Sequence, residues 1–341
     1  MLLYAWNSET TIVKNRLGII YSDAHKVIEA VDFSWLEGKS VLVTGATGQI
    51  GTHFLATLGL LKNDGMKIKA YGYCHSEPED HTKEIACLDD IQLLSEQNVF
   101  TDLDAVIHLA GYAQPSRFTK NPAETIRINV EWTRQLLQYL KPGGKFLFAS
   151  SSEVYSGLSN ADEYQIGTTN PYHPRAGYIE GKRCGEAVVN AFRETGVVDA
   201  QSARLSLVYG PGARRGDSRA VSTFIDQSLK DGVVAMKFSG DELRTFCYIR
   251  DAVEIMWNIL LHGTKAVYNV GSPNSYTIEN VACEIARLSG SRLFTGSNQM
   301  AGASGNVVMD VWRVMNEFKK AHFVGLEEGL RNTIEWHKGG L

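Results

Sequence analysis

The sequence SVLVTGATGQIG at residues 40–51 decides the fold. An apolar, β-branched run at 40–44 is followed by Gly45, Gly48 and Gly51 at the spacing G-x-x-G-x-x-G. Glycines at these places permit a tight turn, a close approach of the backbone to a pyrophosphate, and close packing of a helix on a strand. A helix that begins after such a loop offers free N–H groups and a partial positive charge. The stretch therefore predicts a dinucleotide-binding site.

Similar apolar runs recur at 67–73, 104–110, 144–150 and 201–210, and longer amphipathic stretches separate them. Strands without a polar face are typical of a parallel sheet that is covered on both sides. One amphipathic stretch, 122–140, is expected to be a helix. The alternation predicts a doubly wound parallel α/β sheet of the Rossmann type, in which ligands bind beyond the carboxyl ends of the strands.

We expect three regions along the chain. Residues 1–37 form an N-terminal extension, for which packing on the core or a contact between subunits is the simplest role. Residues 38–190 form the dinucleotide-binding domain, and a strand at 201–209 joins its sheet. Residues 210–341 form a smaller α/β lobe that binds the substrate.

Composition excludes several classes of protein. The 341 residues include 34 basic and 38 acidic side chains, a net charge of −4, which predicts no surface for nucleic acid or an anionic membrane. No apolar run approaches the roughly 20 residues of a membrane span, and the N-terminus does not read as a secretion signal. The five cysteines are widely spaced, which argues against a metal site or a disulfide scaffold and favours a reducing, cytoplasmic location.

Candidate catalytic groups occur in two places. Tyr178 and Lys182 stand four residues apart in YIEGK, on one face of a helix. We expect the ammonium to lower the pKa of the phenol, so that phenolate can take a proton from a substrate hydroxyl while hydride leaves the same carbon. Three serines, Ser150 to Ser152, and Glu153 stand at the end of the strand 144–150, where a hydroxyl can bond the reacting oxygen.

Each feature has an ordinary alternative. A Y-x-x-x-K pair is common on amphipathic helices, serines after a strand often form a loop, and Glu153 can be a solvated carboxylate. Their occurrence together with the glycine loop, in this order along one α/β pattern, favours the catalytic interpretation.

Residues 38–336 resemble the extended short-chain dehydrogenase/reductase family, the NAD-dependent nucleotide-sugar epimerases and dehydratases. The motifs that carry the resemblance are TGATGQIG, HLAG, SSSEVY, YIEGK and VYGPG. The stretches at 170–187 and 219–229 most resemble the UDP-glucuronate decarboxylase branch. The resemblance implies an enzyme that oxidises C4 of a nucleotide-linked sugar transiently and then decarboxylates, dehydrates or epimerises it. It also implies a homodimer formed through the helices around 122–140 and 176–195.

The resemblance implies roles for individual residues and no metal. Tyr178 would act as acid/base, Lys182 would orient the nicotinamide ribose, and Ser151 would be the catalytic hydroxyl. Glu153 would serve a step beyond oxidation. Substrate contacts would come from Ser151, Ser152, Arg219 and Arg244. NAD, or NADP as the alternative, would be held by Gly45, Thr47, Gly48, Gln49, Ile50, Gly51, Leu109, Ala110, Gly111, Asn129, Tyr178 and Lys182.

Some details depart from the family pattern. The second strand ends in Cys74-His75-Ser76, without the acid that would select NAD or an arginine that would select NADP, and we expect NAD. Leu207 replaces the family's asparagine in R-x-x-N-x-Y-G. The decarboxylase branch's arginine near the C-terminus is absent at 307–310. Its possible substitutes are Arg214, Arg215 and Arg219.

The leading hypothesis is C4 oxidation with a decarboxylase- or dehydratase-like second step, because those branches carry an acidic residue where Glu153 stands. A nucleotide-sugar 4-epimerase is the first alternative. An NADP-dependent ketoreductase or a catalytically idle dinucleotide-binding regulator is the second, since fold does not dictate function. Retention of Ser151, Tyr178 and Lys182 argues against the idle regulator.

Overall fold

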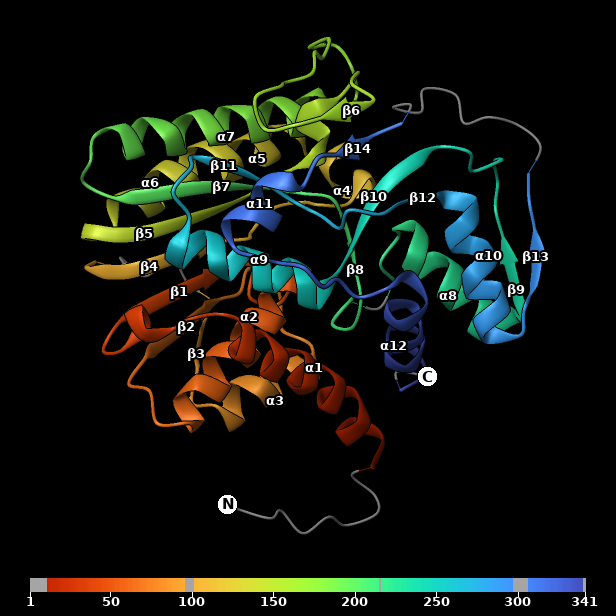
Figure 1. Cartoon of the computed structure of the whole chain (residues 1–341), viewed down its shortest axis with the longest axis horizontal. Coiled ribbons are helices and arrows are strands. Elements are labelled where there is room, and N and C mark those ends of the chain that lie inside the picture. Colours follow the sequence, from red (N-terminus) through yellow and green to blue (C-terminus); the bar gives the residue numbers. More distant parts are fainter. Residues whose placement is uncertain (1–10, 96–100, 215, 297–305, 340–341) are drawn as a thin grey trace.

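The computed structural model describes residues 11–95, 101–214, 216–296 and 306–339. Seven parallel strands form the central sheet, in the order β11-β7-β5-β4-β1-β2-β3 (Figure 1). The predicted doubly wound α/β fold is therefore confirmed. The strands are β1 (Ser40–Thr44), β2 (Lys69–Tyr73), β3 (Gln92–Leu94), β4 (Leu103–His108), β5 (Leu140–Ser151), β7 (Asp199–Leu205) and β11 (Val267–Val270).

Helices cover both faces of this sheet (Figure 1). Every residue of β4 is buried, because a strand in the middle of a sheet that is covered on both sides has no solvent face. One face carries α5 (Pro122–Arg127), a π-helical turn (Ile128–Trp132), α6 (Thr133–Gln138) and α7 (Ala176–Glu194). The other carries α2 (Gln49–Asn63), α9 (Ile249–His262), α3 (Asp80–Leu88) and, packed on α2 and α9, α1 (Thr11–Ala30).

A second group of elements lies beside the carboxyl ends of the central strands (Figure 1). Its three-stranded sheet consists of β8 (Leu207–Tyr209), β10 (Leu243–Tyr248) and β12 (Ser275–Thr277). The group also contains α8 (Ala220–Asp231), β9 (Val233–Ala235), α10 (Ile278–Ser289), β13 (Arg292–Phe294) and α12 (Leu326–Lys338). Short elements complete the fold: α4 (Pro115–Phe118), β6 (Asn160–Ala161), β14 (Val308–Met309), α11 (Trp312–Glu317) and 3-10 turns at Ser34–Leu36 and Ser152–Tyr155.

Three sequence expectations about these elements are wrong in detail. The run 201–210 is not one strand: β7 stays in the central sheet, and β8 pairs with β10 instead. β11 was expected in the lobe and pairs with β7. The helix 122–140 contains a π-helical turn and ends at Gln138, and β5 begins two residues later. Apolar periodicity identifies a strand but not the sheet that it joins.

The described part of the N-terminal extension packs on the core. The Tyr21 hydroxyl of α1 donates to Asp89 (3.0 Å), and the Tyr248 hydroxyl donates to Asp23 of α1 (2.7 Å). Among the described residues, no helix has the length and apolar character needed to cross a membrane.

Candidate active site

The glycine loop has the geometry that its spacing predicts. Gly45 has φ +67°, and a Cβ there would lie 2.8 Å from the backbone nitrogen of Ala110. A Cβ on Gly51 would overlap the Gly45 carbonyl, so glycine lets α2 pack on the turn. Gly48 is the N-cap residue of α2, and it makes no side-chain capping hydrogen bond to the N–H groups of the first turn. The first N–H groups of α2 are therefore available to a ligand.

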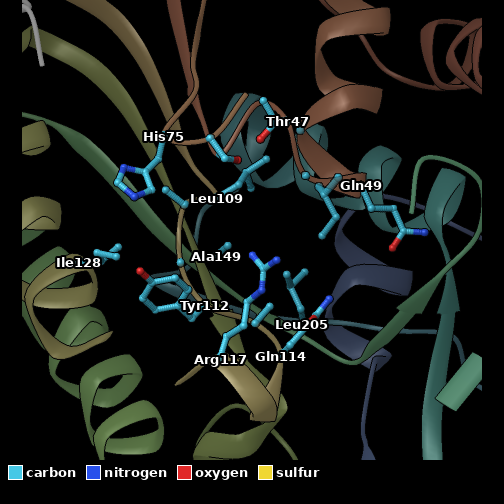
Figure 2. Close-up of a pocket in the computed structure, with 18 of the residues that line it drawn as sticks. Thr47, Gln49, His75, Leu109, Tyr112, Gln114, Arg117, Ile128, Ala149 and Leu205 are labelled. Carbon is cyan, nitrogen blue, oxygen red and sulfur yellow. The ribbon is translucent and has the colours of Figure 1, made fainter. Parts of the chain in front are cut away.

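A cavity of about 290 Å³ opens at this loop, beyond the carboxyl ends of the central strands (Figure 2). Figure 2 shows Gln49 and His75 on opposite sides of it, and Arg117 extending into it from α4. The predicted cofactor residues that line it are Gly45, Thr47, Gly48, Gln49, Ile50, Gly51, Leu109, Ala110, Gly111, Tyr178 and Lys182.

Tyr178 lies at the inner end of this cavity. Its ring stacks on Phe118 of α4, with centroids 4.4 Å apart and planes 12° apart. Ser151, at the end of β5, is close enough to influence this hydroxyl electrostatically, and its own Oγ accepts a hydrogen bond from the Glu153 backbone N–H (3.2 Å). Burial raises the pKa of Tyr178 to about 12, Ser151 opposes this rise, and Glu153 adds to it. The sequence predicts that Lys182 lowers the pKa of Tyr178, and this prediction is wrong for the protein without cofactor. The helical spacing of the two residues does not show how deeply the phenol is buried.

Lys182 is also buried, although it lines the cavity. Its Nζ donates to the carbonyl of Ala149 (2.5 Å) and lies 4.8 Å from the centre of the Phe148 ring and 5.9 Å from that of Tyr178. Burial lowers the pKa of Lys182 to about 7, and Glu186 opposes that change. These contacts hold Lys182 next to Tyr178, and burial disfavours the protonated form of its side chain.

Glu186 cannot pair fully with Lys182, because other groups occupy its carboxylate. It accepts hydrogen bonds from the Ser150 hydroxyl and from Arg204, whose Nη2 lies 2.7 Å from its Oε2. This buried network fixes the end of β5 against α7, and both elements carry residues of the site.

Asn129 does not line the cavity but lies just beneath it. Its Nδ2 donates to the Thr125 carbonyl (2.7 Å), whereas its buried Oδ1 has no hydrogen-bond partner among the residues that the structure describes. A Cβ built on Gly111 would lie 3.9 Å from both Asn129 Oδ1 and Lys182 Nζ. The glycine cradle, the unpaired acceptor and the ammonium together fit the hydroxyls and phosphates of a dinucleotide.

A second, larger cavity of about 920 Å³ lies between this edge of the sheet and the smaller lobe. Glu153 and Arg175 line it and form a two-point ion pair, with Arg175 Nη2 2.5 Å from Oε1 and Nε 3.1 Å from Oε2. Arg244 lines it too, and burial lowers its pKa. Ser152 joins Glu153 and Arg244 around a small adjoining cavity of about 30 Å³. The space, the two arginines and the polar rim suit an anionic substrate.

Arg219 does not line the second cavity, although its charge lowers the pKa of Tyr178, and its role in substrate binding stays a prediction. It lines the first cavity, pairs with Asp217 (Nε to Oδ2, 2.8 Å) and donates to Gln49 (2.9 Å). The reason is that the loop after β8 folds back over the glycine loop, where Gln49 donates to the Gly210 carbonyl (2.6 Å). Of the other arginines named as substitutes, Arg214 lies in this cavity and Arg215 lies outside the described residues.

Sequence reasoning missed Phe118 and Arg175. Arg175 stands three residues before Tyr178, inside the stretch that resembles the decarboxylases, and that position was the available signal. Phe118 gave none, because only the fold brings α4 against α7. Within the described residues, no cluster of three or more His, Cys, Asp or Glu side chains is arranged to hold a metal ion.

Comparisons with known proteins agree with this geometry. A family model described as the NAD dependent epimerase/dehydratase family matches residues 41–271. UDP-glucuronic acid decarboxylase 1 of Xenopus tropicalis is 29% identical over 323 residues, which cover 89% of this chain and 73% of that protein.

Solved structures share the fold. MoeE5 in complex with UDP-glucuronic acid and NAD aligns with a TM-score of 0.73 at 25% identity, covering 89% of this chain and 100% of that one. UDP-glucuronic acid 4-epimerase from Bacillus cereus aligns with a TM-score of 0.74 at 23% identity, and the alignment again covers 89% of this chain and 100% of that one.

Proposed function

Since the chain belongs to the NAD-dependent epimerase/dehydratase family of enzymes, we propose that it oxidises C4 of a UDP-linked hexuronate and then removes the C5 carboxylate as CO2. The observation that carries this proposal is the position of Tyr178, which lines the glycine-loop cavity and whose pKa is influenced by Glu153 and Arg175, two residues that line the second cavity. The similarity to UDP-glucuronic acid decarboxylases supports the choice of substrate.

The cofactor would lie along the glycine loop and extend toward Lys182, with Asn129 behind Gly111. When bound, NAD supplies the hydride acceptor for C4 and a positive charge beside the phenol. The protein's own contribution is to hold the reacting groups in place and to exclude water, because Tyr178 and Lys182 are both buried.

In the first step, Tyr178 takes the proton of the 4-hydroxyl while hydride leaves C4, so that the hydroxyl becomes a ketone. Ser151, whose side chain lowers the pKa of Tyr178, would donate a hydrogen bond to the same oxygen. Because the pKa of Tyr178 is about 12 in the protein alone, the phenolate needs additional cations. The value of about 12 already includes the lowering by Arg175 and Arg219, so the positive charge of the oxidised nicotinamide would have to supply the remaining change.

In the second step, the carboxylate at C5 is β to the new ketone. The C5–C6 bond breaks, CO2 leaves, and the bonding electrons form an enolate whose oxygen Ser151 and Tyr178 can stabilise. C5 then takes a proton, hydride returns to C4, and Tyr178 returns its proton to the oxygen. Glu153 lies beside this centre and is held in place by Arg175, so we assign it to the proton transfers of this step.

A second candidate is 4-epimerisation of the same uronate, supported by the fold shared with the Bacillus cereus epimerase. That reaction would need the ketone to present its opposite face before hydride returns. An NADP-dependent ketoreductase differs from both, because it would consume reduced cofactor in proportion to product.

We also propose that the two main regions of the chain have the roles expected from the sequence. Residues 38–190 with β7 would bind the cofactor, and residues 210–341 would supply most of the substrate lobe, although β11 within that range joins the central sheet. The homodimer through the helices around 122–140 and 176–195 stays a prediction.

Incubation with UDP-glucuronic acid and catalytic NAD, followed by mass spectrometry, tests the function. Decarboxylation gives a product lighter by one CO2, epimerisation gives an isomer of equal mass, and a ketoreductase gives neither without stoichiometric NAD(P)H. A panel of other UDP-, dTDP- and GDP-sugars serves as the control for substrate class. Failure to convert any of them would contradict the proposal.

A further inference from the structure

Arg214 is a cation in the glycine-loop cavity whose guanidinium is not fully paired. It lies in the loop that leads from β8 to α8, and its Nε donates to the Thr47 carbonyl (2.9 Å). Its Nη2 is buried and finds no hydrogen-bond partner among the described residues. Because a buried N–H without an acceptor costs free energy, this nitrogen suits an oxygen of an anionic ligand.

Arg214 lies near the carboxyl end of β2. Burial raises the pKa of the Cys74 thiol to about 11, and the charge of Arg214 opposes this rise. The same charge lowers the pKa of His81 of α3. Cys74 directly follows β2, and the next two residues, His75 and Ser76, line the same cavity as Arg214. Figure 2 shows Thr47 and His75 at the same upper rim of that cavity.

The end of the second strand is where a Rossmann domain recognises the ribose 2′ group of its cofactor. A carboxylate there binds the 2′-hydroxyl of NAD, and a nearby arginine accommodates the 2′-phosphate of NADP. This chain has no acid at Cys74, His75 or Ser76. Arg214 comes from a distant loop but lines the same cavity as His75 and Ser76, and a search confined to the residues after β2 does not find it.

Within the part of the chain that the structure describes, no unpaired carboxylate lines the cavity to repel a phosphate. Its two acidic lining residues are Glu124, which pairs with Arg127 (2.7 Å), and Asp217, which pairs with Arg219 (2.8 Å). Glu77, whose charge raises the pKa of Cys74, forms an ion pair with Lys83. The net field at the end of β2 thus favours an anion.

We propose that Arg214 forms a binding site for the 2′-phosphate of NADP, so that the chain binds NADP with an affinity within about tenfold of its affinity for NAD. The inference rests on the proposed placement of the cofactor along the glycine loop. NAD lacks this phosphate, so its binding does not need the contact, and membership of an NAD-dependent family is compatible with the site.

Calorimetric titration with NAD and with NADP tests the inference. Arg214→Gln should weaken NADP binding by about 10- to 100-fold, as expected for the loss of a charge-assisted hydrogen bond, and NAD binding by less than about threefold. Arg331→Gln, at an exposed ion pair with Glu327 on α12, is the matched control and should change neither affinity. His75→Asp places a carboxylate on the same rim and should also weaken NADP selectively, which provides a test that does not depend on the folding of the Arg214 variant.

The outcomes separate this inference from the proposed function. Equal weakening of NAD and NADP by Arg214→Gln would show that Arg214 contacts a part common to both, such as the pyrophosphate, and would overturn the 2′-phosphate site. A wild-type protein that binds NAD more than about 100-fold better than NADP would overturn it as well. A protein that binds neither dinucleotide would contradict the cofactor site and the proposed function together.

Discussion

Replacement of Lys182 by methionine should stabilise the protein while abolishing turnover. Burial lowers the pKa of Lys182 from 10.5 to about 7, and at 1.36 kcal/mol per pH unit this corresponds to about 5 kcal/mol against the buried cation. Methionine keeps most of the apolar contacts of Lys182 but cannot donate a hydrogen bond to the Ala149 carbonyl. The loss of this bond costs about 2 kcal/mol and offsets part of the gain in stability. We therefore expect a net gain of about 2–3 kcal/mol in the free energy of unfolding at pH 7.

The pH dependence of this gain follows from the sign of the pKa change. Between pH 7 and 10.5 the unfolded chain holds the Lys182 proton and the folded chain releases it, so the penalty on the wild type is complete below pH 7 and disappears above 10.5. The stability difference between Lys182→Met and wild type should accordingly shrink as the pH rises from 7 to 10. Urea denaturation of the cofactor-free proteins at several pH values measures it.

A second buried lysine provides the matched control. Lys320 lies 3.0 Å from Asp251 and 2.8 Å from Glu254, so Lys320→Met would strand two carboxylates and should destabilise the protein by about 3–5 kcal/mol. If Lys182→Met destabilised the protein as much as Lys320→Met does, or if its effect did not depend on pH, the reasoning about the buried ammonium would be refuted.

Three further substitutions test the cofactor loop and the ion pair beside Ser151. Gly48→Val, at the N-cap of α2, should place a side chain in the space left for the pyrophosphate and weaken NAD binding by more than about 100-fold in calorimetry; unchanged binding would remove the glycine loop from the cofactor site. Glu153→Gln and Arg175→Gln should move the rising limb of the kcat–pH profile in opposite directions, to lower and to higher pH, because Glu153 raises and Arg175 lowers the pKa of Tyr178. Shifts of the same sign in both variants would mean that the pair acts only as a structural link.

Local patterns in the sequence were sufficient for the parts of the site that one element provides. The turn at Gly45, the packing of Gly51 and the common helix of Tyr178 and Lys182 all follow from spacing within a few residues, and the structure has them. The doubly wound sheet follows from the alternation of apolar runs and amphipathic stretches.

Features that depend on burial or on distant segments could not be predicted in this way. The pKa of Tyr178 is set by its environment against Phe118, and spacing says nothing about desolvation. The pairing of Glu153 with Arg175 joins residues 22 positions apart, and the contact of Arg214 with Thr47 joins residues 167 positions apart. Only the folded chain brings such groups together.

The central claim is that Tyr178 mediates a transient oxidation at C4 that is reversed within the same turnover. Incubation of the wild type and of Tyr178→Phe with UDP-glucuronic acid that carries deuterium at C4 tests it most directly. The account predicts that the wild-type product keeps its deuterium at C4 without net change in the amount of oxidised NAD, and that the phenylalanine variant binds NAD but forms no product. Loss of the label to water, or full turnover by the variant, would contradict it.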